Sequence, residues 1–392
     1  MADNNFIPSS KEANRVQALE RPETFVDKRQ ALIKKFDNAS FSWFYARACI
    51  VAGFGFFTDG YGWHVISFVS PMVGYAYNDD SATSKNAAIG LKISGPFGMM
   101  IGQLVFGYLA DRYGRKKENL DQAADDINFI VSGNVKYNNN RRHQNNANKT
   151  TLAAVYSHFR EWKHGRVLLA ASFAWFFVDL ATYGFRSDTP LAGINLAARE
   201  DTPYERVLEK NYNSAICLVS GFFPGAITTF FTIDHYGRKP ITYFGFAMSA
   251  ILFVIFGSII GFAPMTMAVR SQWNIAMTTI IMFFQTCGPD PVTFLIAGEL
   301  FPTRFRSTGY AITAAIGKLA AVISYLGFEL LFDVEEMDKN PKRVFYWSLI
   351  LAFAMLFGMG FTYYLPETNG RSLEEIAGEN TENEIGLNNN TR

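Results

Sequence analysis

Charge is scarce in this chain: only 18% of its 392 residues are charged, whereas a soluble globular protein carries about a quarter. The formal net charge of +1 is far from the strongly basic balance of a nucleic-acid binder, so that class is excluded. Three cysteines are too few for a disulfide framework. The first forty residues are polar and lack an apolar run behind a basic start, so we expect no cleaved signal peptide.

Long uncharged runs take the place of the missing charge, and hydrophobic residues make up 49% of the chain. The runs 211–233, 241–269 and 344–366 contain no charged residue at all. A helix needs about 20 apolar residues to cross the core of a bilayer. The sequence therefore predicts an all-α membrane protein with about eight transmembrane helices, over residues 42–75, 87–110, 166–186, 212–233, 240–262, 272–297, 307–332 and 344–365.

Basic residues gather in alternate loops, after the second, fourth and sixth predicted helices. Lys and Arg in short loops stay in the cytoplasm, so these loops and both termini are expected there. The stretch 118–165 begins acidic and becomes rich in Asn and Arg, which is typical of a solvated linker. The predicted domains are a cytoplasmic N-terminal segment (1–41), an incomplete N-terminal half with two helices (42–117), a cytoplasmic linker (118–165), a C-terminal six-helix bundle (166–366) and a cytoplasmic tail (367–392).

Catalytic motifs are missing from the sequence. It has no phosphate-cradling Gly-rich loop, no His/Cys cluster at metal-ligand spacing and no nucleophile elbow. We therefore expect no enzyme activity, no cofactor and no metal site.

One loop sequence occurs twice, at the ends of the second and fourth predicted helices. Asp111 in the first copy corresponds to Asp234 in the second, and Arg115 corresponds to Arg238. A duplicated loop of the same orientation indicates two parallel repeats, and its charged residues could bridge two bundles when a gate closes. A basic turn that only sets topology is the alternative. The residues assigned to gating are Asp111, Arg112, Arg115, Asp234, Arg238, Glu299, Arg304 and Arg306.

The first copy of this loop, residues 107–117, has the form G-x-L-A-D-R-x-G-R-K-K, which resembles the signature loop of the major facilitator superfamily. Further motifs make the chain similar to the phosphate:H⁺ symporter family of fungi and plants. The resemblance implies a major facilitator fold and inorganic phosphate and protons as the transported partners. The other motifs lie at residues 56–61, 175–184, 288–290, 298–308, 317–318 and 365–368.

The chain departs from this family in its first half. Family members have twelve helices, six per half, whereas only two predicted helices precede the linker here. The resemblance therefore implies a truncated fold of two plus six helices that lacks helices three to six, with the join near residues 117–121. Removing four spans leaves the sidedness of everything after them unchanged.

A candidate site lies on the predicted helix 166–186. Trp175, Asp179 and Tyr183 are four residues apart, so they share one helix face. A carboxylate within a span is costly and usually faces a polar interior, and the indole N–H and phenol O–H can donate to an anion. Lys318 is a cation within an apolar run, so phosphate and Asp179 are suitable partners for it. The resemblance implies that Lys318 is the family's substrate-binding lysine. The alternatives are an interface belt of Trp and Tyr, and snorkelling of Lys318.

Two further carboxylates complete the candidate set. Asp59 lies within the first predicted span, and the resemblance implies a role in proton movement, shared with Asp179; a structural contact beside neighbouring glycines is the alternative. Asp290 stands where the family usually has Asn, and an ionised Asp would repel phosphate. Either Asp290 is protonated, or Lys318 neutralises it, or the substrate differs. The expected substrate-binding residues are Trp175, Asp179, Tyr183, Asp290 and Lys318.

Two functions from different classes remain open. The first is a proton-coupled inorganic phosphate symporter of the plasma membrane, with a glycerophosphodiester as the alternative substrate. The second is a non-transporting membrane protein, which could associate with another membrane chain. The missing helices favour impaired transport by this chain, because alternating access needs two bundles that move around a shared site.

Overall fold

The computed structural model describes residues 85–114, 151–185, 203–331, 340, 342–371 and 373–377, together with isolated positions between 43 and 69. Helices account for nearly all of these residues, and no strand occurs among them. Within the described residues, seven helical spans are long and apolar enough to cross a membrane. The chain is therefore an integral membrane protein of the all-α class, as the sequence predicts. The seven spans are Ile89–Tyr113, Trp162–Phe185, Asn211–Tyr236, Arg238–Phe262, Ala268–Glu299, Thr303–Phe328 and Lys342–Thr362.

Each of these seven spans matches a predicted helix to within a few residues at either end. The first predicted helix, 42–75, lies mostly outside the described residues, and so do the N-terminal segment 1–41, most of the linker 118–165 and most of the tail 367–392. The linker ends in a short helix that the sequence did not delimit, α6 (Leu152–Arg160), which is capped by the Thr151 side chain.

The chain divides into two units. The smaller comprises Met1–Tyr61 and Lys116–Ala147, and the larger comprises Gly62–Arg115 and Asn148–Arg392. The described residues of the smaller unit are helical, and the rings of Phe54, Phe57 and Tyr61 follow one another along one helix face. The larger unit contains every element that follows.

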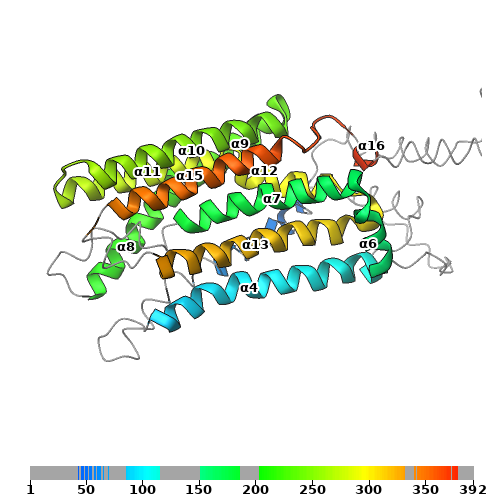
Figure 1. Ribbon diagram of the computed structural model, residues 1–392, viewed down its shortest axis with the longest axis horizontal. Helices are drawn as coiled ribbons and strands as arrows, with labels where there is room; N and C mark the ends of the chain where they lie inside the picture. The colour runs from blue at the N-terminus through cyan, green and yellow to red at the C-terminus, as the bar shows by residue number, and fades with distance from the viewer. Residues whose placement is uncertain are drawn as a thin grey trace, which may run out of the picture. The chain divides into compact units, whose positions relative to one another are not determined.

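In the larger unit the long helices lie side by side in an order unlike their order in the sequence (Figure 1). Helix α4 (Lys85–Leu109) packs on α13 (Arg306–Leu331), which packs on α7 (Trp162–Phe185). Helix α7 in turn contacts α15 (Lys342–Thr362), and α15 contacts α10 (Arg238–Phe262). Helix α11 (Met267–Thr286) packs on α10, and α8 (Pro203–Cys217) and α9 (Phe223–Tyr236) pack on α11. Helix α12 (Pro289–Glu299) contacts α10 and α7.

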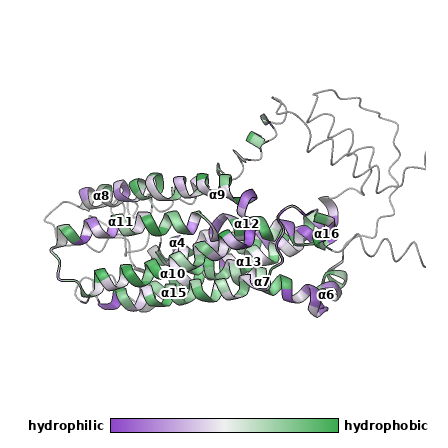
Figure 2. Cartoon of the chain, turned by 90° about the horizontal axis from the view of Figure 1, so that it is seen from above, coloured by the Kyte–Doolittle hydropathy of each residue, from purple (hydrophilic) through white to green (hydrophobic). Residues whose placement is uncertain are grey.

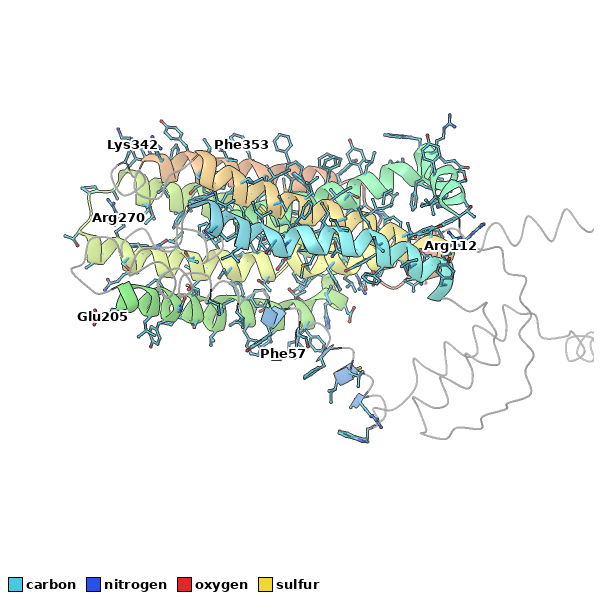
Figure 3. All side chains as sticks on the ribbon, turned by 90° about the horizontal axis from the view of Figure 1, so that it is seen from below. Phe57, Arg112, Glu205, Arg270, Lys342 and Phe353 are labelled. Carbon is cyan, nitrogen blue, oxygen red and sulfur yellow. The ribbon has the colours of Figure 1, made fainter. Side chains whose placement is uncertain are left out.

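The core of the bundle is built from large apolar side chains of α7, α10 and α15. Phe185 contacts Phe253 and Phe256 edge to face, with ring centroids 5.0 Å apart in both pairs. Other large apolar side chains on the same helices are exposed, such as Phe357 and Phe353, which points outward (Figure 3). Figure 2 shows α10 and α15 as mainly hydrophobic and α6 as mainly hydrophilic. Apolar side chains on both sides of a helix are what a membrane requires, since the bilayer replaces water as the solvent.

The predicted helix 272–297 is two helices, because the chain breaks between Thr286 and Pro289. Pro289 has no backbone N–H and its ring clashes with the preceding turn, so it begins α12 instead of continuing α11. The break packs against α10 at Gly245, where an added Cβ would overlap the Pro289 ring. The signal for this break, Gly288-Pro289, is present in the sequence.

Helices α4 and α13 approach each other closely at Gly107. A Cβ at this position would overlap the Cβ of Ala311 and would lie 2.9 Å from the carbonyl oxygen of Ser307. Small residues allow such backbone approach between membrane helices, where packing and not hydrophobic burial drives association. Farther along α4, Ile93 packs against Tyr183, Ala321 and Tyr325.

We expect Gly107→Ala to destabilise the protein by about 1–3 kcal/mol, because overpacking forces the two helices apart. Gly98→Ala is the matched control: it lies on the same helix, and nothing stands within 4 Å of the added Cβ. A helical Gly→Ala change without a clash is neutral or stabilises by up to about 1 kcal/mol. Thermal unfolding of the purified protein in detergent measures both, and equal shifts for the two variants would contradict the contact.

Candidate buried ion-pair site

A buried ion pair joins α7 to α13 in the middle of the bundle. The Nζ of Lys318 lies 2.9 Å from Oδ2 of Asp179 and donates to the hydroxyl of Tyr183 at 3.2 Å. The two charged side chains are 13% and 3% exposed. The ammonium also lies 5.1 Å from the Tyr183 ring centroid, within cation–π range. Asp179 and Tyr183 meet Lys318 together because one helical turn separates them on α7.

Trp175, the third member of the α7 face, is buried one turn before Asp179. Its ring packs edge to face with Phe294 and Tyr310. Gly317 leaves room for it: an added Cβ would lie 2.9 Å from Cδ1 of Trp175 and 3.2 Å from Oδ2 of Asp179. The glycine before Lys318 thus lets α13 pass close to the Trp175–Asp179 face.

Two hydrogen bonds outside the pair fix the C-terminal half of α7. The hydroxyl of Ser324 donates to the carbonyl of Leu180 at 2.8 Å, and the indole N–H of Trp347 donates to the carbonyl of Gly184 at 3.0 Å. These bonds reach α7 from α13 and α15 respectively. The orientation of Asp179 toward Lys318 is therefore held by three helices.

Asp290 occupies the first turn of α12 and lines a small cavity beside the ion pair's helix. The cavity is also lined by Thr182, Gln285, Thr286 and apolar side chains, and neither Lys318 nor Asp179 is among its lining residues. The hydroxyl of Thr182 and the amide nitrogen of Gln285 are buried and have no hydrogen-bond partner in the part of the chain that the structure describes. Neither residue was among the predicted site residues, although Gln285 is a polar side chain inside an apolar run.

Asp111, in the first copy of the duplicated loop, caps the N-terminus of α13. It is 7% exposed, and its carboxylate accepts hydrogen bonds from the backbone N–H groups of Ser307 (3.2 Å) and Thr308 (2.6 Å). A carboxylate at this place satisfies free N–H donors and complements the positive end of the helix dipole. Arg112 next to it donates to the hydroxyl of Tyr108 at 2.8 Å and points away from the bundle end (Figure 3).

The second copy of the loop forms an ion-pair network instead of a cap. Arg238, the first residue of α10, lies 3.0 Å from the carboxylate of Asp234 at the end of α9 and 3.4 Å from that of Glu299 at the end of α12. The side chain of Asp234 is 76% exposed, whereas those of Arg238 and Glu299 are mostly buried. Arg238 therefore ties the α9–α10 loop to α12.

The remaining predicted gating residues take different partners. Arg306 donates from Nε to the carbonyl of Phe301 at 3.1 Å, and the guanidinium of Arg304 lies 5.0 Å from the ring centroid of Phe305. Arg115 and Asp59 lie outside the described residues. No group of three or more His, Cys, Asp or Glu residues at metal-binding distance occurs in the described ranges.

Glu367, which was not among the predicted site residues, binds the α9–α10 loop from the segment that follows α15. Its carboxylate accepts the backbone N–H groups of Arg238 (3.0 Å), Lys239 (2.9 Å), Thr368 (3.0 Å) and Asn369 (3.0 Å). Burial raises the pKa of this carboxyl, but the four donors together outweigh burial and lower the pKa below its usual value.

Gly237 makes this arrangement possible. Its φ of 87° lies in the left-handed region that favours glycine, and an added Cβ would come within 3.0 Å of Oε2 of Glu367. The glycine of the duplicated motif thus leaves space for a carboxylate from the segment after α15.

The apolar spans, with a buried ion pair between two of them and a charged loop at one bundle end, define a helical membrane protein. The chain belongs to the sugar (and other) transporter family, a branch of the major facilitator superfamily. The sequence pattern of that family matches residues 48–120 and 208–379, more than half of the chain. This confirms the family and the truncated major facilitator fold predicted from the sequence, and it sets the chain among transporters, not enzymes.

Curated relatives carry names of phosphate transporters. The chain is 35% identical over 237 residues to the inorganic phosphate transporter PHO84 of Saccharomyces cerevisiae, an alignment that covers 59% of this chain and 39% of the relative. It is 30% identical over 280 residues to the repressible high-affinity phosphate permease of Neurospora crassa, covering 67% of this chain and 48% of the relative. The chain thus spans half or less of the length of these relatives, which is consistent with the predicted lack of helices three to six.

A solved structure of the proton:xylose symporter XylE bound to 6-bromo-6-deoxy-D-glucose is also similar. Its sequence is 15% identical to this chain, the TM-score is 0.43, and the match covers 74% of this chain and 67% of that one.

We expect the two single variants Lys318→Met and Asp179→Asn to be much less stable than the double variant. Each single change leaves one buried charge uncompensated, which costs about 3–5 kcal/mol, whereas replacing both charges is nearly neutral. Membrane-inserted protein level and thermal unfolding in detergent measure the effect. A double variant as unstable as the worse single one would show that the pair does not couple α7 to α13.

We also expect the Glu367 contacts to weaken as the solution is acidified. Because the folded-state pKa is depressed, the carboxylate contributes stability above the ordinary glutamate pKa of about 4.3, and this contribution is lost as the pH falls through the lower folded-state value. In Glu367→Gln the slope of thermal stability against pH below about 5 should be shallower. The matched control is Glu375→Gln on α16 (Leu373–Ala377), an exposed glutamate without the four backbone donors of Glu367, which should change the slope less.

Proposed function

We propose that the chain binds inorganic phosphate between α7 and α13, and that a form with helices three to six present transports phosphate together with protons. The observation that carries the proposal is the cluster of Lys318, Asp179 and Tyr183, buried in the spans of a chain whose curated relatives are named phosphate transporters. Trp175 and Asp290 belong to the proposed binding residues.

The chemistry of the cluster links phosphate to a proton. Lys318 is neutralised by Asp179 while the site is empty, so an entering anion meets a carboxylate that repels it. When Asp179 takes up a proton, it becomes an O–H donor, and the charge of Lys318 becomes available to the phosphate oxygens. Proton and phosphate therefore favour each other's binding, and this coupling is reciprocal. Asp59 is the second proposed proton-carrying carboxylate.

Asp290 bears on the choice of substrate. It lines the cavity that also contains the amide of Gln285 and the hydroxyl of Thr182, which are donors suited to an ionised carboxylate or to an anion's oxygens. A glycerophosphodiester is the alternative substrate, because it carries one negative charge and would be repelled less by Asp290 than a phosphate dianion.

The remaining parts of the proposal concern the membrane. We propose a location in the plasma membrane, as the family resemblance implies. We also propose that both termini lie in the cytoplasm, because the basic loops follow alternate spans. Residues 42–117 would form the incomplete N-terminal half and 166–366 the C-terminal bundle. The loop residues Asp111, Arg112, Arg115, Asp234, Arg238, Glu299, Arg304 and Arg306 would act in gating.

The test is binding of labelled phosphate to purified chain in liposomes, measured at several pH values. Wild-type affinity should fall as the pH rises, because Asp179 must carry a proton. The ionisation of phosphate itself changes binding equally in wild type and in Asp179→Asn. The variant should therefore keep that part of the pH dependence and lose most of the rest. Lys318→Ala should bind at least about tenfold more weakly, the equivalent of about 1.4 kcal/mol.

Lys342→Ala is the matched control, because this lysine is exposed at a bundle end. Unchanged binding in Lys318→Ala, or an equal loss in Lys342→Ala, would overturn the assignment of the site. Glycerophosphocholine as a competitor tests the alternative substrate. Under an inward proton gradient the same liposomes should not accumulate phosphate, since one bundle is incomplete; accumulation abolished by a protonophore would show that these helices suffice.

A further inference from the structure

A second cavity, of about 430 Å³, lies at the end of the bundle where α6 joins α7. Its walls are the α6–α7 junction, the turn between α12 and α13, the segment that follows α15, and α16. Figure 1 shows α6 and α16 at this same end of the larger unit. Nothing in the proposed phosphate site uses these residues.

The walls of this cavity combine positive charge with an apolar floor. Lys163 and Arg166 supply two permanent cations, His158 and His164 supply imidazoles, and Glu375 supplies one carboxylate, so the lining has an excess of positive charge. The floor is formed by buried side chains that include Leu300, Phe301 and Leu365.

Ring contacts hold α6 against the start of α7 and the turn before α13. The His158 and His164 rings stack with centroids 4.1 Å apart, and His158 also lies 4.9 Å from the ring of Phe305. Gly165 allows the first turn of α7 to approach α6, because an added Cβ would lie 2.6 Å from the carbonyl oxygen of Phe159. The cavity is therefore bounded by packed elements on several sides.

The cavity lies at the level of the lipid headgroups. Lys163 and Arg166 are in the first turns of α7, whose membrane span begins at Trp162. Trp162 and Tyr364, next to the cavity, are 74% and 62% exposed. Exposed Trp and Tyr at the ends of spans are typical of the membrane–water interface.

We propose that this cavity binds the phosphorylated headgroup of an anionic membrane phospholipid. Lys163 and Arg166 would pair with the phosphate oxygens, as basic pockets at the ends of membrane helices do. The glycerol and first acyl carbons would lie on the floor at Phe301 and Leu365. Free phosphate fits less well, because it has no apolar part to cover that floor and would lose hydration against it.

The lipid would touch both sides of the loop network. Leu300 follows Glu299, the partner of Arg238, and Leu365 comes two residues before Glu367, the cap of the α9–α10 loop. Occupancy of the cavity would therefore stiffen the α6–α7 junction and this network together.

The experiment is native mass spectrometry of the full chain, delipidated in detergent. Dioctanoyl phosphatidylinositol 4-phosphate should bind saturably as one molecule per chain. Dioctanoyl phosphatidylcholine should bind at least tenfold more weakly. Inorganic phosphate, which also has the proposed site at Lys318, should displace the lipid only at concentrations at least tenfold higher than the lipid's own. Inorganic phosphate that binds as tightly as the lipid and competes with it would overturn the lipid assignment.

The variants locate the binding. Lys163→Ala/Arg166→Ala should weaken lipid binding at least tenfold, and the single changes Lys163→Gln and Arg166→Gln, which keep most of each stem, should each lose part of it. The matched control is Arg270→Ala/Lys342→Ala, which also removes two cations but at the opposite bundle end from Arg112 (Figure 3). Wild-type binding in the first double variant, or an equal loss in the control, would overturn the proposal.

Discussion

A charge in hydrocarbon must be paired, and the Lys318–Asp179 contact is the pairing on which the arrangement of α7 and α13 depends. Because the ammonium bonds to a carboxylate on the facing helix, each helix must keep this side chain turned toward the other helix. The bonds from Ser324 and Trp347 to carbonyls of α7 extend this register to α15. These polar contacts add to the close apolar packing of the bundle and help to select one register.

The two copies of the duplicated loop show how context decides the use of a motif. Both have an Asp at the helix end, but Asp111 lies beside the beginning of α13 and caps it, whereas Asp234 is exposed and pairs with Arg238. The first copy therefore ties α4 to the C-terminal bundle through backbone donors. The second copy pairs the Arg238 side chain with Glu299, and its own backbone N–H groups at Arg238 and Lys239 donate to Glu367. Identical spacing in the sequence thus gives a cap in one place and a network in the other.

The positions of the spans could be predicted because uncharged runs of helical length leave little choice in a bilayer. The shared face of Trp175, Asp179 and Tyr183 followed from helical periodicity. Lys318 bonds to Asp179 across 139 residues of sequence. This contact depends on tertiary packing: two opposite charges within apolar spans suggest such a pair, but the sequence does not specify which helices face each other. The cap by Glu367 and the cavity with Gln285 and Thr182 were not predicted, because each needs elements distant in sequence. The break before Pro289 had a local signal, Gly288-Pro289, but it lies inside a long apolar run that was predicted as one helix.

The cap by Asp111 has a consequence for biogenesis. Its backbone donors belong to residues 196 and 197 positions later in the chain. At a synthesis rate of about 5–20 residues per second, α13 leaves the ribosome roughly 10–40 s after α4. Helix α4 must therefore wait in the bilayer without its α13 partner, with the Asp111 carboxylate hydrated at its end. Docking of α4 onto α13 is consequently a late step of assembly, and quality-control factors that recognise unpaired spans have this interval in which to act.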